Sequence, residues 1–147
     1  MSEVYARIKG NGDYPELHGI VTFFEVYNGT LVTVYMEGLP TNQYGNFFGF
    51  HIHEGGSCTG DEKDPFKNAG SHYNPTNQVH PFHAGDMPVL MGNADTVWCQ
   101  FYTNRFYPED VVGKTVIVHD MPDDFRSQPS GDAGVKIACG VIEMRMS

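Results

Sequence analysis

The apolar residues of this chain fall into short runs rich in β-branched and aromatic side chains, and polar residues, glycine and proline separate the runs. None of the runs carries a sustained helical period, so each of them predicts a strand. The predicted strands are 4–8, 20–24, 31–35, 47–52, 97–102, 115–118 and 136–142. Asn28-Gly29 predicts a tight hairpin between two of them, because type I′ turns need residues that tolerate a positive φ. The pattern therefore predicts an all-β fold, an antiparallel sandwich or barrel of seven or eight strands.

Two irregular stretches interrupt the even spacing of the predicted strands. The first runs from Glu54 to about Thr96 and is rich in Gly, Pro, Asn, His and Asp, and the second runs from Asp120 to Val135. A loop as long as the first, inside one domain, is either functional or disordered, and side chains that bind metals favour function. We therefore expect two long functional loops on the β scaffold.

Length and charge limit the domain organisation and the partners. The 147 residues suffice for one well-filled core, so we expect a single domain over residues 1–147. The net charge of −9 argues against nucleic acid and membrane surfaces as partners, because both need a basic footprint. No stretch approaches the roughly 20 apolar residues of a membrane span, and no signal peptide is visible at the start. We expect a cytoplasmic protein from the chain as given, and a periplasmic or extracellular one if the chain is the mature part of an exported precursor.

Six of the seven histidines form a pattern that is typical of metal binding. In a strand, residues i and i+2 point to the same face about 6–7 Å apart, so His51 and His53 are able to converge on one ion. His119, at the end of a predicted strand, is a candidate third ligand. Alone, each of these histidines would more often be packed in the core or exposed, and the case for metal binding rests on the group.

A second group lies in the first long loop. His80, His83 and Asp86 are three residues apart, a spacing that suits one side of a tetrahedral zinc ion. His72 lies between the two groups, and a deprotonated imidazole has two nitrogens that can each bind a metal. The pattern therefore predicts two metal ions that share His72, against the alternative of a polar loop that holds histidines without a metal.

These residues, in this order, resemble the copper,zinc superoxide dismutases of the bacterial type. The matching motifs are His51-x-His53, Gly70-Ser71-His72-Tyr73-Asn74-Pro75, His80…His83-Ala84-Gly85-Asp86, Val118-His119 and Ala138-Cys139-Gly140-Val141-Ile142. The resemblance covers nearly the whole chain, from Leu17 to Ile142. It implies a Greek-key, immunoglobulin-like β-sandwich or flattened barrel of about eight antiparallel strands.

The resemblance also implies an activity and two cofactors. Superoxide would be converted to O₂ and H₂O₂ by Cu(II)/Cu(I) cycling, and His72 would take up a proton when copper is reduced. The implied copper ligands are His51, His53, His72 and His119, and the implied zinc ligands are His72, His80, His83 and Asp86.

Outside the ligands, the resemblance implies further roles. Asp123 would link a copper histidine to a zinc histidine by hydrogen bonds, which fixes both rings. Three cysteines by themselves permit three pairings, and the resemblance selects a disulfide between Cys58 and Cys139 and leaves Cys99 unpaired.

One position departs from the family pattern. Where the family has an arginine that guides superoxide to copper, this chain has Lys136, which keeps the charge but loses the planar fork of donors. We therefore expect activity below the family norm. Arg126, in the second loop, is a candidate replacement for the guanidinium, and the alternative is that it faces solvent. We predict that Lys136→Arg raises activity or that Arg126→Ala sharply lowers it.

Other functions compete with dismutation. The main alternative is a protein of the same kind that binds or delivers copper with weak or no catalytic activity, and Lys136 is the feature that favours it. Metallo-β-lactamase-like hydrolases and cupins also use His-x-His. A cupin would leave the second ligand group unexplained. A hydrolase of that kind has Asp-His soon after the histidine pair, whereas Glu54-Gly55 follows it in this chain. The expected partners are superoxide anion as substrate and, as suggestions of the resemblance, a copper donor protein and a second copy in a homodimer.

Overall fold

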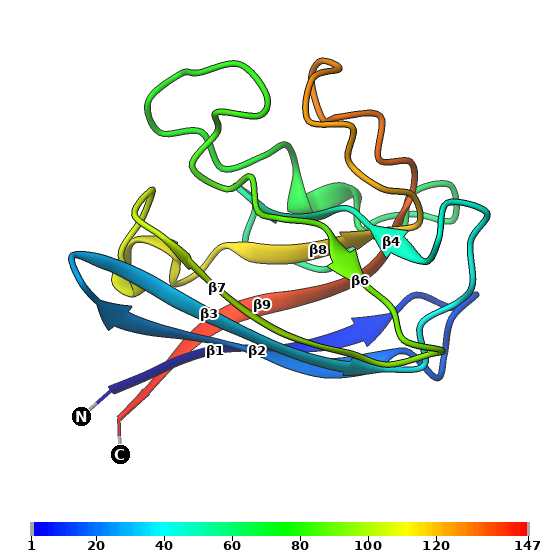
Figure 1. Cartoon of the computed structure of the whole chain (residues 1–147), viewed down its shortest axis with the longest axis horizontal. Coiled ribbons are helices and arrows are strands. Elements are labelled where there is room, and N and C mark those ends of the chain that lie inside the picture. Colours follow the sequence, from blue (N-terminus) through cyan, green and yellow to red (C-terminus); the bar gives the residue numbers. More distant parts are fainter. Residues whose placement is uncertain (1, 147) are drawn as a thin grey trace.

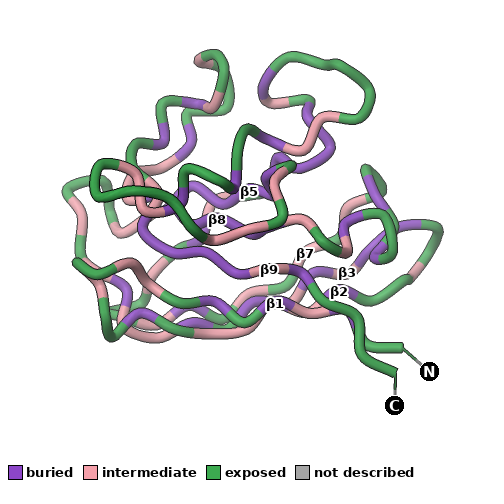
Figure 2. The backbone as a smooth tube through the Cα atoms, turned by 180° about the vertical axis from the view of Figure 1, so that it is seen from behind, coloured by how far each residue is buried: buried purple, intermediate pink, exposed green. Residues whose placement is uncertain are grey.

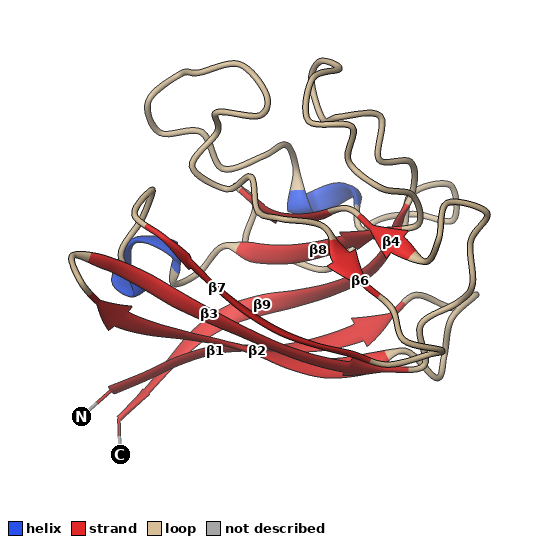
Figure 3. Ribbon diagram, in the orientation of Figure 1, coloured by secondary structure: helices blue, strands red, loops and turns tan. Residues whose placement is uncertain are grey.

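The predicted strands form a curled antiparallel sheet that encloses the core (Figures 1 and 3). The structure is a computed structural model and describes residues 2–146. Its strands are β1 (Ser2–Gly10), β2 (His18–Val26), β3 (Gly29–Glu37), β4 (Phe47–Phe48), β5 (Phe50–His53), β6 (Leu90–Met91), β7 (Val97–Thr103), β8 (Thr115–His119) and β9 (Lys136–Met146), with short 3₁₀ helices η1 (Lys67–Ala69) and η2 (Pro108–Val111). Seven strands form one sheet in the order β5-β8-β9-β1-β2-β3-β7, and β4 and β6 pair separately. The predicted all-β, antiparallel fold is confirmed.

Burial differs between the two ends of the large sheet. Strands β1, β2 and β7 alternate between buried and less buried positions, as expected for strands with one apolar face. In contrast, every residue of β5 and β8 is buried (Figure 2). The core covers one face of these two strands, and the long loops lie over the other side of this end of the sheet (Figure 1). Side chains of β5 and β8 that face the loops are therefore shielded from water.

Three local details refine the sequence-based prediction. The expected single strand 47–52 is divided at Gly49, whose amide donates to Met121 O and whose carbonyl accepts from His119 N, both at 2.8 Å. Strand β6 is not among the predicted strands, because it is only two residues long. The hairpin turn is confirmed, but its positive-φ residues are Tyr27 and Asn28, and Gly29 already pairs with Val26 in the strands.

The first long loop covers the free edge of β5. Ile52, in the middle of that strand, donates from its amide to Gly85 O (2.9 Å) and accepts from Tyr73 N (2.8 Å). A disulfide between Cys58 and Cys139 ties the same loop to β9, and Cys99 is free, as the resemblance implies. The loop is thus held against the sheet at Cys58, Tyr73 and Gly85. No helix among residues 2–146 is long and apolar enough to cross a membrane.

Candidate metal centre

Neighbouring strands supply three of the candidate ligands. His51 and His53 alternate with core residues on β5, and antiparallel pairing sets them opposite Ile117 and Thr115 of β8. His119 ends β8 at a break in the register between β8 and β9. All three histidines are buried. Their positions follow from ladder hydrogen bonds, which the strand-forming sequence dictates.

The first loop brings its ligands to the strand ligands by pairing with β5. Isolated bridges set His72 beside His53, and Asp86 beside His51. The loop approaches so closely that a Cβ on Gly85 would lie 2.4 Å from Ile52 O, so the position requires glycine. The same backbone contacts that cover the strand edge therefore assemble the candidate centre.

The candidate ligands converge in two groups that share His72. Donor atoms of His51, His53, His72 and His119 lie within 4.8 Å of one another, and so do those of His72, His80, His83 and Asp86. Every one of these side chains is buried. The structure thus brings together all seven residues that the sequence suggested as ligands, in the grouping that the sequence suggested.

Hydrogen bonds to backbone carbonyls fix the tautomers of two rings. His53 Nδ1 donates to Gly70 O (2.7 Å), and His119 Nδ1 donates to Gly134 O (3.2 Å). A carbonyl oxygen only accepts, so the proton of each neutral ring is on Nδ1 and the lone pair is on Nε2. Both Nε2 atoms are buried without a hydrogen-bond partner. These lone pairs are available to a metal ion.

Asp123 fixes two further rings, one from each group. His51 Nε2 donates to Asp123 Oδ2 (2.6 Å), and His80 Nε2 donates to Asp123 Oδ1 (2.7 Å). The amide of Phe125 also donates to Asp123 Oδ1 (2.7 Å), and Gly131 leaves room for the carboxylate, because a Cβ there would overlap with it. The contact of Asp123 with His51 and His80 is therefore a pair of hydrogen bonds. Because Nε2 of each neutral ring donates to Asp123, Nδ1 of each ring carries the lone pair.

In the second group, three imidazole rings surround the carboxylate of Asp86 at hydrogen-bond distance. His80 Nδ1 lies 3.0 Å from Asp86 Oδ2 but makes no hydrogen bond, and His83 Nδ1 lies 3.1 Å from the same oxygen. His72 Nδ1 lies 2.8 Å from Asp86 Oδ1 and 3.2 Å from His83 Nδ1. Buried acceptors at these distances need a proton or a cation between them.

The electrostatic environment keeps the strand histidines neutral. Burial lowers the pKa of His53 well below its usual value, and the nearby His72 and His119 lower it further. Burial, followed by the charge of His51, lowers the pKa of His119 to about 3. For Asp123, burial favours the neutral form, but hydrogen bonds from His51 and His80 outweigh it and lower the pKa to about 2. At neutral pH His53 and His119 are therefore neutral imidazoles, which are the form that binds metals.

Taken together, the donor set fits two metal ions. Five buried ring nitrogens have no hydrogen-bond partner: His51 Nδ1, His53 Nε2, His72 Nε2, His80 Nδ1 and His119 Nε2. An all-imidazole group suits copper, and a group of three imidazoles and a carboxylate suits zinc. Because both ring nitrogens of His72 face ligand groups, this residue is placed to contact both ions.

A cavity of about 500 Å³, here called the access cavity, leads to the first group. Among its lining residues are His53, His72, His119 and Lys136. The side chain of Arg126 is exposed and is not among the lining residues. The structure therefore places Lys136 at the cavity, whereas it does not bring Arg126 there.

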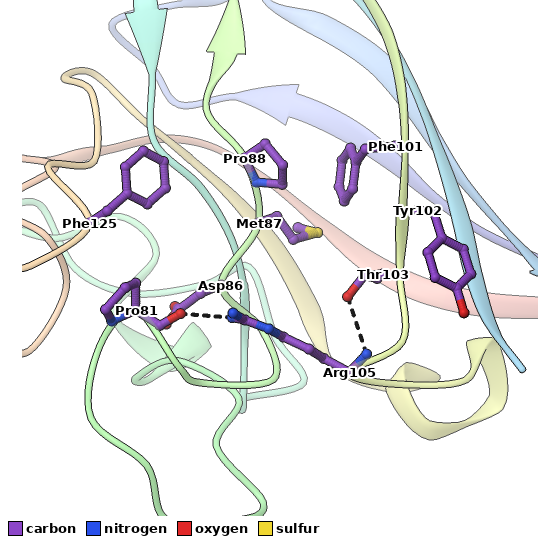
Figure 4. Close-up of a pocket in the computed structure, with 9 residues that line it drawn as sticks. All are labelled: Pro81, Asp86, Met87, Pro88, Phe101, Tyr102, Thr103, Arg105 and Phe125. Atoms are coloured by element: carbon purple, nitrogen blue, oxygen red, sulfur yellow. Dashed lines mark hydrogen bonds between the residues drawn. The ribbon is translucent and has the colours of Figure 1, made fainter.

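Two side chains that the sequence did not single out hold the loop of His80 and His83 in place. Gln128 makes a pair of hydrogen bonds with the backbone of His80: its side-chain oxygen accepts from the amide (2.9 Å), and its side-chain nitrogen donates to the carbonyl (2.7 Å). Arg105 donates to Pro81 O (2.7 Å) and His83 O (3.0 Å), at the rim of a second cavity (Figure 4). Both act on backbone groups that any residue would present, so no sequence motif marks them.

Comparison with known proteins agrees with this geometry. The Copper/zinc superoxide dismutase (SODC) family model matches residues 17–142. The chain is 37% identical to superoxide dismutase [Cu-Zn] 2 of Aquifex aeolicus in an alignment 145 residues long that covers 86% of this chain and 80% of the relative. It is 31% identical to superoxide dismutase [Cu-Zn] of Schizosaccharomyces pombe, with 97% of each chain covered.

Solved structures of similar proteins share the fold. The Cu/Zn superoxide dismutase from Brucella abortus superposes with a TM-score of 0.82 and 30% identity, over 97% of this chain and 100% of that one. A double mutant of a SOD-like protein from Bacillus subtilis superposes with a TM-score of 0.78 and 28% identity, over 95% of this chain and 96% of that one. Family model, relatives and architecture agree, and this chain belongs to the copper/zinc superoxide dismutase family.

Proposed function

We propose that this chain converts superoxide to O₂ and H₂O₂ at a centre that holds one copper and one zinc ion. The observation that carries the proposal is the set of five buried ring nitrogens whose lone pairs converge without a hydrogen-bond partner. Leaving so many buried acceptors unsatisfied costs about 1–3 kcal/mol each, unless a ligand compensates for it. Family membership identifies metal ions as that ligand.

The proposed ligands are the ring nitrogens and the carboxylate that converge in the two groups. Copper would be held by His51 Nδ1 and by Nε2 of His53, His72 and His119. Zinc would be held by Nδ1 of His72, His80 and His83 and by the carboxylate of Asp86. When bound, copper supplies a one-electron couple, and zinc supplies a fixed positive charge without redox change.

The residues of the chain then perform the remaining tasks. His72 lines the access cavity, and its Nε2 has no hydrogen-bond partner, so this atom, when it is not bound to copper, would hold a proton and pass it to superoxide as superoxide is reduced to H₂O₂. Asp123 keeps the rings of His51 and His80 in fixed orientations, which keeps the two groups in register while that proton moves. Lys136 supplies positive charge at the cavity wall, which attracts the superoxide anion.

Reconstitution with both metals tests the proposal. We expect about one copper and one zinc per chain by elemental analysis, and dismutation of superoxide by the loaded protein. His72→Gln should reduce retention of both metals, whereas the control His18→Gln, an exposed histidine on β2, should leave it unchanged. Two bound metals without dismutation would favour the copper-binding alternative, and only one bound metal would contradict a shared His72.

The copper donor protein, the homodimer and the compartment stay predictions. A donor is proposed because the candidate copper ligands are buried and a metal must be delivered to them. Sedimentation of the loaded protein over a range of concentrations tests the dimer, and cell fractionation distinguishes a cytoplasmic location from a periplasmic or extracellular one.

A further inference from the structure

Lys136 is positioned next to the candidate copper ligands by the sheet. It begins β9 and pairs with His119 of β8, beyond the register shift at Val118. Within the described range 2–146, Lys136 is the only lysine or arginine that lines the access cavity. Its charge is therefore the positive side-chain charge that an incoming anion meets at the cavity wall.

The ammonium group of Lys136 is nevertheless occupied. Lys136 Nζ donates to Asp64 Oδ2 at 3.0 Å, in a contact whose side chains are 18% and 40% exposed. Asp64 belongs to the first long loop, and both residues also line a neighbouring cavity of about 370 Å³. Lys136 thus lines both the access cavity and this neighbouring cavity, whereas Asp64 lines only the neighbouring one of the two.

The loop holds Asp64 rigidly in this position. The amide of Asp64 donates to Asp61 Oδ1 (2.8 Å), and its carbonyl accepts hydrogen bonds from the amides of Asp61 (3.0 Å) and Lys67 (3.1 Å). Its Oδ1 accepts from the amide of Phe66 (3.3 Å), which leaves Oδ2 for Lys136. The disulfide of Cys58 further ties this loop to β9. The carboxylate is therefore pre-organised to hold the lysine.

We propose that Asp64 is a positioning residue that tethers Lys136 and lowers the affinity of the access cavity for small anions, including the substrate. A cation paired with a carboxylate presents a dipole rather than a net charge, and its attraction for an anion falls off faster with distance. Flexible, partly exposed lysine is free to turn toward the histidines once the carboxylate charge is removed. The proposal rests on the proposed function for the identity of the substrate, whereas the tether itself is a property of the metal-free chain.

Asp64→Asn removes the charge and keeps the shape. Asparagine retains an oxygen that accepts from the amide of Phe66, and the other loop contacts of Asp64 are made by its backbone. The matched control is Glu62→Gln, which removes the same charge from the rim of the same neighbouring cavity but does not touch the Lys136 ion pair. Thermal unfolding and metal content verify that both variants are folded and loaded.

Anion binding to the loaded protein gives the first readout. Azide affinity, followed through the copper absorption, and kcat/KM for superoxide should both rise about threefold in Asp64→Asn at an ionic strength of about 0.01 M and converge toward the parent at about 1 M. Glu62→Gln should change each by less than half as much. An unchanged or lowered azide affinity in Asp64→Asn would overturn the proposal, as would an equal rise in Glu62→Gln.

A second readout needs neither metal nor activity. In the metal-free protein, limited acetic anhydride should acetylate Lys136 about threefold faster in Asp64→Asn than in the parent, relative to Lys114, because the amine has lost its bound partner. In a Lys136→Gln background, Asp64→Asn should no longer change azide affinity, which a purely structural role would not predict. Unchanged acetylation would refute the tether even if the chain bound no copper. Failure to bind copper with increased acetylation would refute the proposed function alone.

Discussion

Two halves of the candidate centre meet at His72 and are held in place by different means. The strand half consists of His51, His53 and His119, which stand on β5 and β8 between ladder hydrogen bonds and buried core residues. The loop half consists of His80, His83 and Asp86, which stand on irregular backbone in the first long loop. Continuous strand ladders position the strand half, whereas the loop half is positioned by a few backbone bridges to β5 and by side-chain contacts from distant segments.

The difference predicts unequal robustness. The strand half moves only if β5 or β8 leaves the sheet, which requires much of the core to unfold. The loop half depends on three polar side chains, Asp123, Gln128 and Arg105, each of which contributes one or two hydrogen bonds. Segments with few buried contacts open at lower free energy than core strands. Weakening single contacts should therefore affect the loop half first.

The largest effect on stability should come from the disulfide, which anchors the loop behind His53 to β9. Replacing both Cys58 and Cys139 by serine releases a link across 81 residues. In the loop-closure picture this lowers the free energy of unfolding by about 4 kcal/mol. Chemical denaturation of the metal-free protein, with and without reductant, measures it. Cys99→Ser is the control, because Cys99 is free. A loss no larger than that of the control would show that the sheet alone holds the loop.

The next largest effect should separate the two halves. Asp123→Ala leaves His51 Nε2 and His80 Nε2 buried without an acceptor, and it removes a carboxylate that touches a ring from each half. Losing such an orienting partner typically weakens metal binding about 10–100-fold, and we expect the zinc site to lose more affinity than the copper site.

Chelator competition for each metal measures the two affinities. The control is Asp124→Asn, an exposed neighbour that bonds to Ser127 and, among the described residues, to no candidate ligand. Equal losses at both metals would contradict the unequal robustness of the two halves.

A smaller effect is expected from Arg105, which touches the loop half alone. Arg105→Ala removes the donors to Pro81 O and His83 O, and zinc affinity should fall about two- to fivefold, since the contact is partly exposed to water. Copper affinity should be unchanged. Arg105→Lys retains a single donor group and should fall in between. In the metal-free variant, hydrogen exchange at residues 80–86 should be faster than in the parent, and unchanged exchange would remove Arg105 from the set that holds the loop half.

The strand half and the loop half also differ in how far their positions can be predicted from the amino-acid sequence. Strand periodicity alone predicts that His51 and His53 share one face, because a two-residue period leaves no other choice. The strands and the irregular loop 54–96 are also recognisable from residue patterns, but the way in which that loop folds against β5 is not. Its bridges to β5 depend on main-chain contacts such as Tyr73 N to Ile52 O, for which no side chain is diagnostic.

Residues that support the ligands show the limit most clearly. Asp123 is recognisable through the resemblance to a family, whereas the roles of Gln128, Arg105 and Asp64 depend on contacts across 48, 22 and 72 residues of sequence. A single polar residue in a loop has many possible partners at such separations. Only the three-dimensional arrangement selects one of them.

The smallest effect is expected from Arg126, and it tests which cation serves the strand half. The exposed side chain of Arg126 does not line the access cavity, so Arg126→Ala should leave kcat/KM of the loaded protein within about twofold of the parent. Lys136→Arg should raise it by about two- to fivefold, because a guanidinium has donors enough to keep its bond to Asp64 and still present one edge to the cavity. Stopped-flow dismutation at low ionic strength measures both. A tenfold loss in Arg126→Ala, with no gain in Lys136→Arg, would mean that the second loop closes over the cavity and delivers Arg126 to the anion, and the tether between Lys136 and Asp64 would then have a purely structural role.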